Sequence, residues 1–225
     1  MGAAVYLVKL KDIVSEPDER MTRLIPADRI ERMHRYRQCA DRVRCCAAGI
    51  AAISAAAEHS GRAYENISLI SAQTKAPYAV LPDGRKVYLS ISHSGDWAAA
   101  IADSSKCGID VELIRDVPEM RGFLMKYFMQ EEAELVDGAE SFFRLWTAKE
   151  AYLKYLGTGL SRSLSSFRVT SDSTCFHIED SVSTKAEELI CTAFTIETAC
   201  FSIVTENGVD NIKTVSIEDI LQRSI

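Results

Sequence analysis

Helix and strand patterns are mixed along this chain without alternating regularly, and this order constrains the fold more than any other feature. The stretch 26–59 has the spacing of one long helix, which begins at Pro26 and which Gly61 would end. Strand patterns follow at 67–70, 87–92, 97–102 and 107–113, then helix patterns at 120–136 and 140–156, and then further β-rich runs. A parallel sheet built from repeated strand–helix units would alternate strictly, so the sequence favours an α+β fold.

The size and charge of the chain exclude several classes of protein. It has 225 residues, enough for one large domain or two small ones, and its hydrophobic content of 47% is that of a soluble globular protein. The formal net charge of −6 argues against a nucleic-acid partner, because such binding depends on a basic surface. The longest charge-free stretch, 45–57, is shorter than the roughly 20 residues that span a bilayer, so we expect no membrane association.

The N-terminus and the cysteines indicate a cytoplasmic location. No basic segment precedes the short apolar run at the N-terminus, so the sequence does not predict a signal peptide. The seven cysteines are an odd number and include no Cys-x-x-Cys pair. Scattered thiols of this kind suit packing in a reducing compartment.

Positive charge is concentrated near the start of the long helix pattern. Residues 20–44 contain eight arginines against three acidic residues, although the chain as a whole is acidic. One local basic face on an acidic protein indicates a small anionic ligand rather than a polyanion.

The segment Gly108–Glu112 places two carboxylates on one face of a strand. Residues two apart in a strand share a face, so Asp110 and Glu112 project together while Ile109 and Val111 face the other side. Two neighbouring carboxylates raise each other's pKa unless a cation lies between them, and oxygen ligands favour magnesium or manganese. The alternative is an exposed strand face with solvated acids.

A second candidate lies on the helix pattern at 140–156. Phe143, Trp146, Glu150 and Lys154 lie on one helical stripe, because residues three and four apart are neighbours. Glu150 and Lys154 are either an ordinary salt bridge or a pair that holds a metal ion and a phosphate together. Lys149 points about 100° away around the helix and is a weaker candidate for the phosphate.

The third candidate is His93, at the end of a strand pattern. Alternation places His93 on one face and Ser90 and Ser92 on the other, before a turn rich in hydroxyl and backbone N–H groups. Such a turn can bind an anion, with the imidazole as a further donor. The alternative is an inert turn histidine.

Together these segments resemble the 4′-phosphopantetheinyl transferases of the surfactin-type, pseudodimeric class. That family has Ser-His-Ser-Gly, then Gly-Ile-Asp-Xaa-Glu, then Trp-Xaa-Xaa-Lys-Glu-Ala-Xaa-Xaa-Lys followed by Gly-Xaa-Gly-Leu. This chain matches it in order and spacing at residues 92–95, 108–112, 146–154 and 157–160. The resemblance implies transfer of 4′-phosphopantetheine from coenzyme A to a serine of an apo acyl or peptidyl carrier protein, with release of adenosine 3′,5′-bisphosphate. The alternatives are an inactive module that binds coenzyme A or a carrier protein, and an unrelated α+β protein.

The resemblance also implies a fold and an assembly. We expect two similar α/β halves, residues 1–106 and 107–225, with the active site at their interface in a monomer.

The resemblance assigns roles to particular residues. It implies that Mg²⁺, with Mn²⁺ as the alternative ion, is held by three carboxylates: Asp110, Glu112 and Glu150. Lys154 would contact the pyrophosphate of coenzyme A, and Ser92 and His93 its adenosine end. Basic contacts to coenzyme A would come from Arg29, Arg32, Arg44 and Lys75. The base that activates the carrier serine would be Glu132, with Glu131 or a metal-bound water as alternatives.

One departure from the family pattern affects Lys75. The family usually has Gly-Lys/Arg-Pro before the histidine segment, whereas here Ala76 stands before Pro77 and Lys75 comes one position early. A strand residue shifted by one position points to the opposite face, so the predicted contact of Lys75 requires a bulge in this loop.

Overall fold

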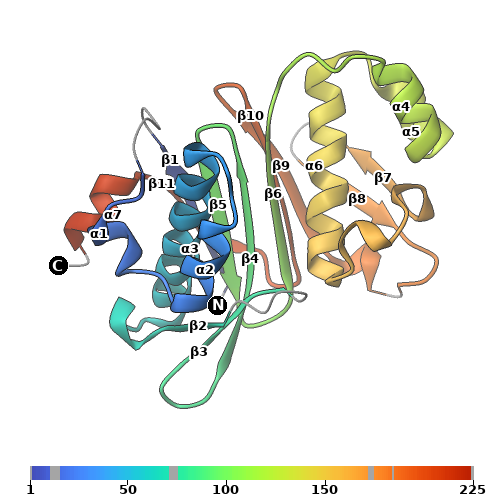
Figure 1. The fold of residues 1–225 in the computed structure, drawn as a ribbon. Coiled ribbons are helices and arrows are strands. Elements are labelled where there is room, and N and C mark those ends of the chain that lie inside the picture. Colours follow the sequence, from blue (N-terminus) through green and yellow to red (C-terminus); the bar gives the residue numbers. More distant parts are fainter. Residues whose placement is uncertain (1, 11–15, 71–75, 172–174, 184, 224–225) are drawn as a thin grey trace.

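The fold is that of a computed structural model, which describes residues 2–10, 16–70, 76–171, 175–183 and 185–223. It is mixed α+β, as predicted, with a six-stranded sheet, a three-stranded sheet and a two-stranded ribbon (Figure 1). The helices are α1 (Glu19–Thr22), α2 (Ala27–His34), α3 (Cys39–Ser60), α4 (Met120–Tyr127), α5 (Gln130–Leu135), α6 (Ala139–Leu156) and α7 (Ile217–Arg223). Short 3₁₀ turns lie at Tyr64–Asn66, Gly159–Ser161, Leu164–Ser166 and Ala186–Glu188.

The larger sheet combines strands from both ends of the chain. Its order is β11-β1-β5-β4-β3-β2, and β1 pairs in parallel with β11 but antiparallel with β5. The strands are β1 (Ala3–Lys9), β2 (Ser68–Ile70), β3 (Tyr78–Val80), β4 (Lys86–Ser94), β5 (Trp97–Asp103) and β11 (Val209–Ser216). Because β11 joins this sheet, the predicted division at residue 106 does not separate the two sheets completely.

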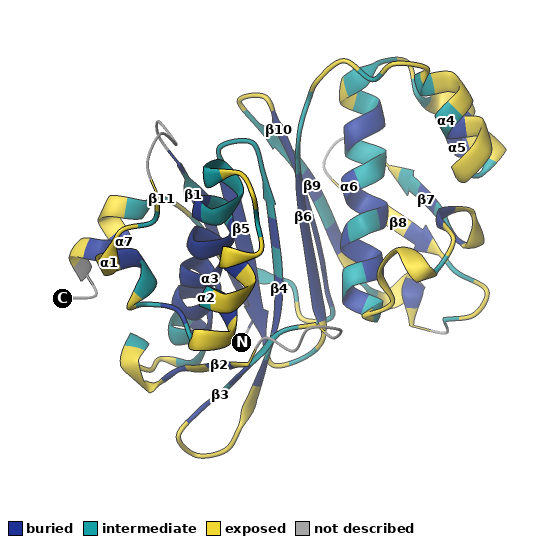
Figure 2. Cartoon of the chain, in the orientation of Figure 1, coloured by how far each residue is buried: buried dark blue, intermediate teal, exposed yellow. Residues whose placement is uncertain are grey.

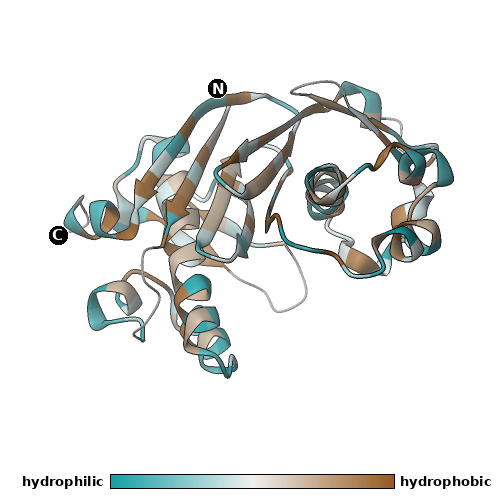
Figure 3. Cartoon of the chain, turned by 90° about the horizontal axis from the view of Figure 1, so that it is seen from above, coloured by the Kyte–Doolittle hydropathy of each residue, from teal (hydrophilic) through white to brown (hydrophobic). Residues whose placement is uncertain are grey.

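The smaller sheet has the order β6-β10-β9 and packs against α6. Its strands are β6 (Cys107–Leu113), β9 (Ile190–Ile196) and β10 (Ala199–Thr205), and the ribbon is β7 (Arg168–Ser171) with β8 (Phe176–Glu179). Figure 3, a view from above, shows the sheets between the long helices of the two sides.

The fold has four layers: α3, the larger sheet, the smaller sheet and α6. Side chains that alternate along the strands fill the spaces between these layers. On β5, Ala98 and Ala100 pack in the cluster under α3, whereas Trp97 and Ile101 pack in a second cluster that includes Ile109 of β6. This second cluster lies between the two sheets, and the strands that form it are among the most buried in the chain (Figure 2).

The predicted long helix at 26–59 is wrong in one respect, because it is interrupted between α2 and α3. The chain folds back at Arg35–Gln38, so that Arg29 of α2 donates from Nε to the Cys45 carbonyl of α3 at 3.1 Å. A Cβ at Gly49 would lie 2.5 Å from Arg29 Nε, so glycine allows this close packing. The interruption therefore depends on contacts between the two helices, which local helix propensity does not report.

None of the helices in the described ranges combines the length and the apolar character needed to cross a membrane.

Candidate active site

The candidate site lies where β4 of the larger sheet runs beside β6 of the smaller one. We call this region, Ser90–Ser94 with Gly108–Leu113, the β4–β6 junction. Ser90 Oγ accepts from the Ile109 N–H at 3.1 Å, and Ser94 Oγ accepts from the Leu113 N–H at 3.3 Å. Serine hydroxyls thus provide hydrogen bonds between two strands that belong to different sheets.

Asp110 is the most enclosed acid of the β4–β6 junction. One of its oxygens, Oδ1, accepts from the hydroxyl of Ser92 at 2.7 Å and from Lys154 Nζ at 2.8 Å. The other oxygen, Oδ2, is buried and has no hydrogen-bond partner among the described residues. An unsatisfied buried carboxylate oxygen is costly, which points to a ligand at this position.

Lys154 connects the two strands directly. Besides Asp110, its ammonium donates to the carbonyls of Ile91 on β4 at 3.1 Å and Ile109 on β6 at 3.0 Å. All three ammonium hydrogens therefore have acceptors within the protein. A phosphate could approach this cation only if it displaces or shares one of these acceptors.

Glu150 lies one helical turn before Lys154 on α6. The pKa of Glu150 is raised to about 7, chiefly by burial and also by the nearby charges of Asp110 and Glu112, whereas Lys154 acts in the opposite direction. Its Oε1 is also buried without a hydrogen-bond partner in the described part of the chain. Three acidic side chains thus influence one another here, as the strand and helix patterns predict.

Glu112 is held at the edge of this group. Its Oε2 accepts from the hydroxyl of Ser94 at 2.7 Å and pairs with Arg115 at 3.2 Å. Within the described ranges, no three His, Cys, Asp or Glu side chains are already arranged closely enough to hold a metal ion. The donor set nevertheless fits a hard cation, because Asp110 Oδ2 and Glu150 Oε1 are both buried carboxylate oxygens without a hydrogen-bond partner among the described residues.

The approach of α6 to β6 depends on Gly108. A Cβ there would lie 1.9 Å from the Ala151 carbonyl oxygen of α6, so any side chain would push the helix away. With glycine, the strand face that carries Asp110 and Glu112 packs directly on the helix that carries Glu150 and Lys154.

A basic group faces the opposite side of β4. The pKa of His93 is lowered to about 4, chiefly by burial and also by the positive charges of Arg29, Lys154 and Arg44. Arg44 donates from Nε to the Gly95 carbonyl in the turn after β4 and pairs with Asp41 at 2.7 Å. Arg29 is buried, and the loss of solvent around its guanidinium lowers its pKa; among the described residues no acidic side chain forms an ion pair with it. A buried guanidinium without an acidic partner favours an anion nearby.

The other residues predicted to contact coenzyme A are placed differently. Ser92 faces Asp110 rather than the basic side, because consecutive strand residues point to opposite faces. Arg32 is exposed on α2. Lys75 lies outside the described residues.

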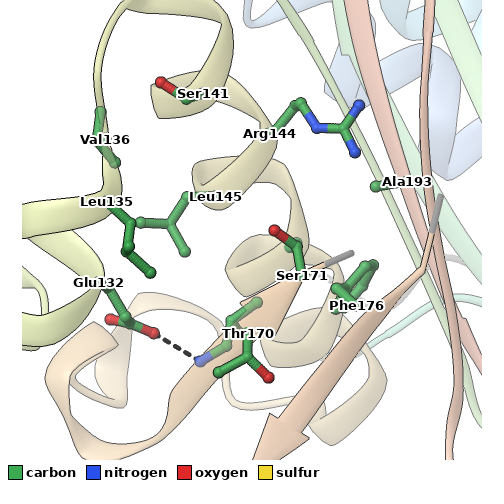
Figure 4. A pocket seen from close by; sticks show the side chains of 12 residues that line it. Glu132, Leu135, Val136, Ser141, Arg144, Leu145, Thr170, Ser171, Phe176 and Ala193 are labelled. Atoms are coloured by element: carbon green, nitrogen blue, oxygen red, sulfur yellow. Dashed lines mark hydrogen bonds between the residues drawn. The ribbon is translucent and has the colours of Figure 1, made fainter. Parts of the chain in front are cut away.

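Glu132, the predicted base, lies away from the three carboxylates. Its Oε1 pairs with Lys149 Nζ at 2.7 Å and accepts from the Val169 N–H at 2.6 Å, the bond drawn dashed in Figure 4. Its Oε2 accepts from the Met129 N–H at 3.1 Å. Lys149 is fully buried and on a different face of α6 from Glu150, so it is not placed to contact a phosphate. The alternative base, Glu131, is exposed.

Comparisons with known proteins fit this arrangement. A sequence model of the 4′-phosphopantetheinyl transferase superfamily matches residues 106–196, which include β6 and α6. A 4′-phosphopantetheinyl transferase of Bacillus subtilis is 31% identical over 158 residues, covering 68% of this chain and 69% of that protein. The chain belongs to the 4′-phosphopantetheinyl transferase family. Its relatives include the ffp transferase of Bacillus subtilis, 26% identical over 71% of this chain and 72% of that one. They also include the Sfp transferase of Bacillus subtilis strain 168, which is 34% identical over 40% of this chain and 42% of that protein.

As a transferase of the Sfp type, the chain contains contacts that sequence reasoning missed. Ser94 and Lys149 both lie inside the family motifs, but their partners are remote in sequence and their contacts become visible only in the fold. The alternation of Ser90, Ser92 and Ser94 was the one available signal, since three small polar residues on one strand face indicate a polar neighbour.

Proposed function

We propose that this transferase moves 4′-phosphopantetheine from coenzyme A to the serine hydroxyl of an apo acyl or peptidyl carrier protein, releasing adenosine 3′,5′-bisphosphate. The observation that supports this most directly is the pair of unpaired, buried oxygens on Asp110 and Glu150, next to the ammonium of Lys154. Acids and a cation in one place can hold a metal ion and a pyrophosphate together.

We propose that Asp110, Glu150 and Glu112 hold Mg²⁺, with Mn²⁺ as a possible substitute. Such an ion would supply charge neutralisation for the pyrophosphate during attack by the carrier serine. Lys154 would add a second positive charge, and Ser92 and Ser94 would keep the oxygens of Asp110 and Glu112 oriented.

The basic side of β4 would bind the adenosine end of coenzyme A. Arg29 is the strongest candidate, because it is buried and has no acidic partner among the described residues. His93 is neutral at pH 7, since its pKa is about 4, so it would act as a hydrogen-bond donor rather than as a cation. Arg44, Arg32 and Lys75 would contribute long-range attraction.

The proposal includes two similar halves with the active site between them. It is supported by one long helix on each sheet, α3 on the larger and α6 on the smaller, and by the position of the β4–β6 junction. We also propose that the enzyme acts as a cytoplasmic monomer, for which buried thiols such as Cys45, Cys46 and Cys107 are the support.

The test is incubation of the protein with coenzyme A, MgCl₂ and a panel of apo acyl and peptidyl carrier proteins, read by intact mass. We expect one 4′-phosphopantetheine group to be added to at least one carrier, and none in the presence of EDTA. Coenzyme A binding by calorimetry without any change in carrier mass would instead indicate an inactive binding module.

A further inference from the structure

A buried ion pair lies on a different face of α6 from Glu150 and Lys154. Lys149 Nζ and Glu132 Oε1 are 2.7 Å apart, and their side chains are 0% and 1% exposed. Lys149 also donates to the carbonyls of Leu164 and Phe167, both at 2.7 Å. The ammonium therefore has three acceptors, and it lies 4.3 Å from the ring centre of Phe167.

This pair connects segments that are remote in sequence. Lys149 belongs to α6, Glu132 to α5, and the two carbonyls to the segment before β7. Glu132 adds a bond to the Val169 N–H of β7, and Figure 4 shows its carboxylate directed at this strand. The helix that carries Glu150 and Lys154 is thus fixed to α5 and β7 on one side, while Gly108 allows its contact with β6 on the other.

The environment of Glu132 does not suit a group that takes a proton from a carrier protein. Its carboxylate accepts three hydrogen bonds and the residue is 2% exposed, so a macromolecular substrate has little access to it. Residues Lys149 and Glu150 point about 100° apart around the helix, so Glu132 and the three carboxylates lie against different faces of α6.

We propose that Lys149 and Glu132 are positioning residues, which fix α6 so that Glu150 and Lys154 reach Asp110, and that Glu132 is not the base. This inference rests on the proposed function. A buried ion pair often contributes little net stability compared with apolar residues in its place. Removal of only one partner, however, leaves an uncompensated buried charge. Such a pair can specify one arrangement of the elements that it joins, and here that arrangement sets the geometry of the active site.

The experiment compares Glu132→Gln, Lys149→Met and the double variant Glu132→Gln/Lys149→Met in the full chain. Each is assayed for kcat, for KM of coenzyme A, for the pH dependence of kcat and for Tm. Each single variant should have a kcat lower by roughly tenfold or more. Its Tm should also be lower, because one buried charge remains without a partner. The double variant should recover most of the lost kcat and Tm. The fall of its kcat at low pH, the acidic limb of the profile, should be the same as in the wild type.

A control removes a more exposed ion pair of similar length at the edge of the larger sheet. Lys213 Nζ lies 2.6 Å from Glu58 Oε2, remote from α6. Lys213→Met should lower Tm without changing kcat at a temperature where the protein is folded. This separates a loss of geometry in α6 from a general loss of stability.

Two results would overturn the inference. A folded double variant that is as slow as Glu132→Gln, or that loses the acidic limb, would mean that the Glu132 carboxylate takes part in the chemistry. Single variants with wild-type kcat and only a lower Tm would mean that the pair is merely structural. If a single variant does not fold, kcat and the pH profile of the double variant decide. A wild-type protein that modifies no carrier would instead contradict the proposed function, before any variant is compared.

Discussion

The hydroxyl of Ser92 donates to Asp110 Oδ1 at 2.7 Å, across the β4–β6 junction. This bond, together with that of Lys154, leaves only Oδ2 of Asp110 without a partner. Ser92 therefore selects which carboxylate oxygen is available to a ligand.

The first prediction concerns this orientation. Ser92→Ala should raise the Mg²⁺ concentration needed for half-maximal transfer by roughly tenfold, because residues that orient metal ligands typically contribute 10- to 100-fold. KM for coenzyme A should change much less. Ser60→Ala is the control, because it removes a hydroxyl whose bonds within the described residues go to the carbonyls of Ala56 and Ala57 in its own helix. An unchanged Mg²⁺ dependence would show that Ser92 does not orient Asp110.

The second prediction concerns Glu150. Glu150→Gln should reduce transfer by at least about 100-fold, since a neutral amide is a poor ligand for a hard cation. Its Tm without metal should be equal to or higher than that of the wild type, because burial and the charges of Asp110 and Glu112 disfavour the ionised form of Glu150. Thermal unfolding with and without MgCl₂ measures both effects. Wild-type transfer by this variant would remove Glu150 from the metal site.

The third prediction concerns the pH dependence of stability. His93 has a pKa of about 4 in the folded protein, against about 6.5 in an unfolded chain. The unfolded state therefore binds more protons between these values, so the free energy of unfolding falls as pH falls through this window. Between pH 7 and pH 5 we expect a loss of about 2 kcal/mol from this group.

Urea unfolding of the wild type and of His93→Gln at both pH values measures this loss. The variant should lack the contribution of His93, whereas His34→Gln, at an exposed position, should behave like the wild type. An equal drop in all three proteins would contradict the burial of a neutral His93.

The fourth prediction concerns Arg29. Arg29→Leu should raise KM for coenzyme A by roughly tenfold or more, because charge-assisted hydrogen bonds to phosphate are strong. The effect should be smaller for 3′-dephospho-coenzyme A, if Arg29 contacts the phosphate at the adenosine end. Arg35→Leu, at an exposed position near the end of α2, is the control. Equal KM changes for both nucleotides would place Arg29 elsewhere.

The fifth prediction concerns carrier recognition at α4. Met125 and Tyr127 of this helix are 49% and 41% exposed, and Lys126 is exposed between them. Carrier proteins are expected to be acidic around the modified serine, so Lys126→Glu should raise KM for the carrier several-fold and leave that for coenzyme A unchanged. Arg121 is unsuitable for this test, because it donates to the Ala133 carbonyl at 2.7 Å and joins α4 to α5.

The control for this surface is Lys106→Glu, an exposed position before β6, at the opposite end of that strand from α4. Kinetics with both substrates varied should show the difference. Equal effects of the two variants would reject α4 as the docking surface.

Local patterns predicted the elements that carry the chemistry. The strand expected at 107–113 is β6, and the helix expected at 140–156 is α6 within one residue, because alternation and helical spacing are properties of the segment itself. The common face of Asp110 and Glu112 followed from the same alternation.

What the sequence could not predict depends on contacts between remote segments. The break between α2 and α3 needs the packing of Arg29 against Cys45 and Gly49, and strong helix formers on both sides conceal it. The role of Glu132 could not be predicted for the same reason, because its partners Lys149 and Val169 lie 17 and 37 residues away in the chain. No spacing rule joins these positions until α5, α6 and β7 are packed.

The parallel pairing of β1 with β11 has a consequence for synthesis of the protein. Ala3 to Lys9 are synthesised about 200 residues earlier than Val209–Ser216, their neighbour on one side, which must be made before the two strands can pair. Until then β1 presents an unpaired apolar edge, and such edges favour association between chains. We therefore expect nascent chains, and chains truncated before β11, to aggregate more readily than chains that contain β11, because the larger sheet cannot be completed without that strand.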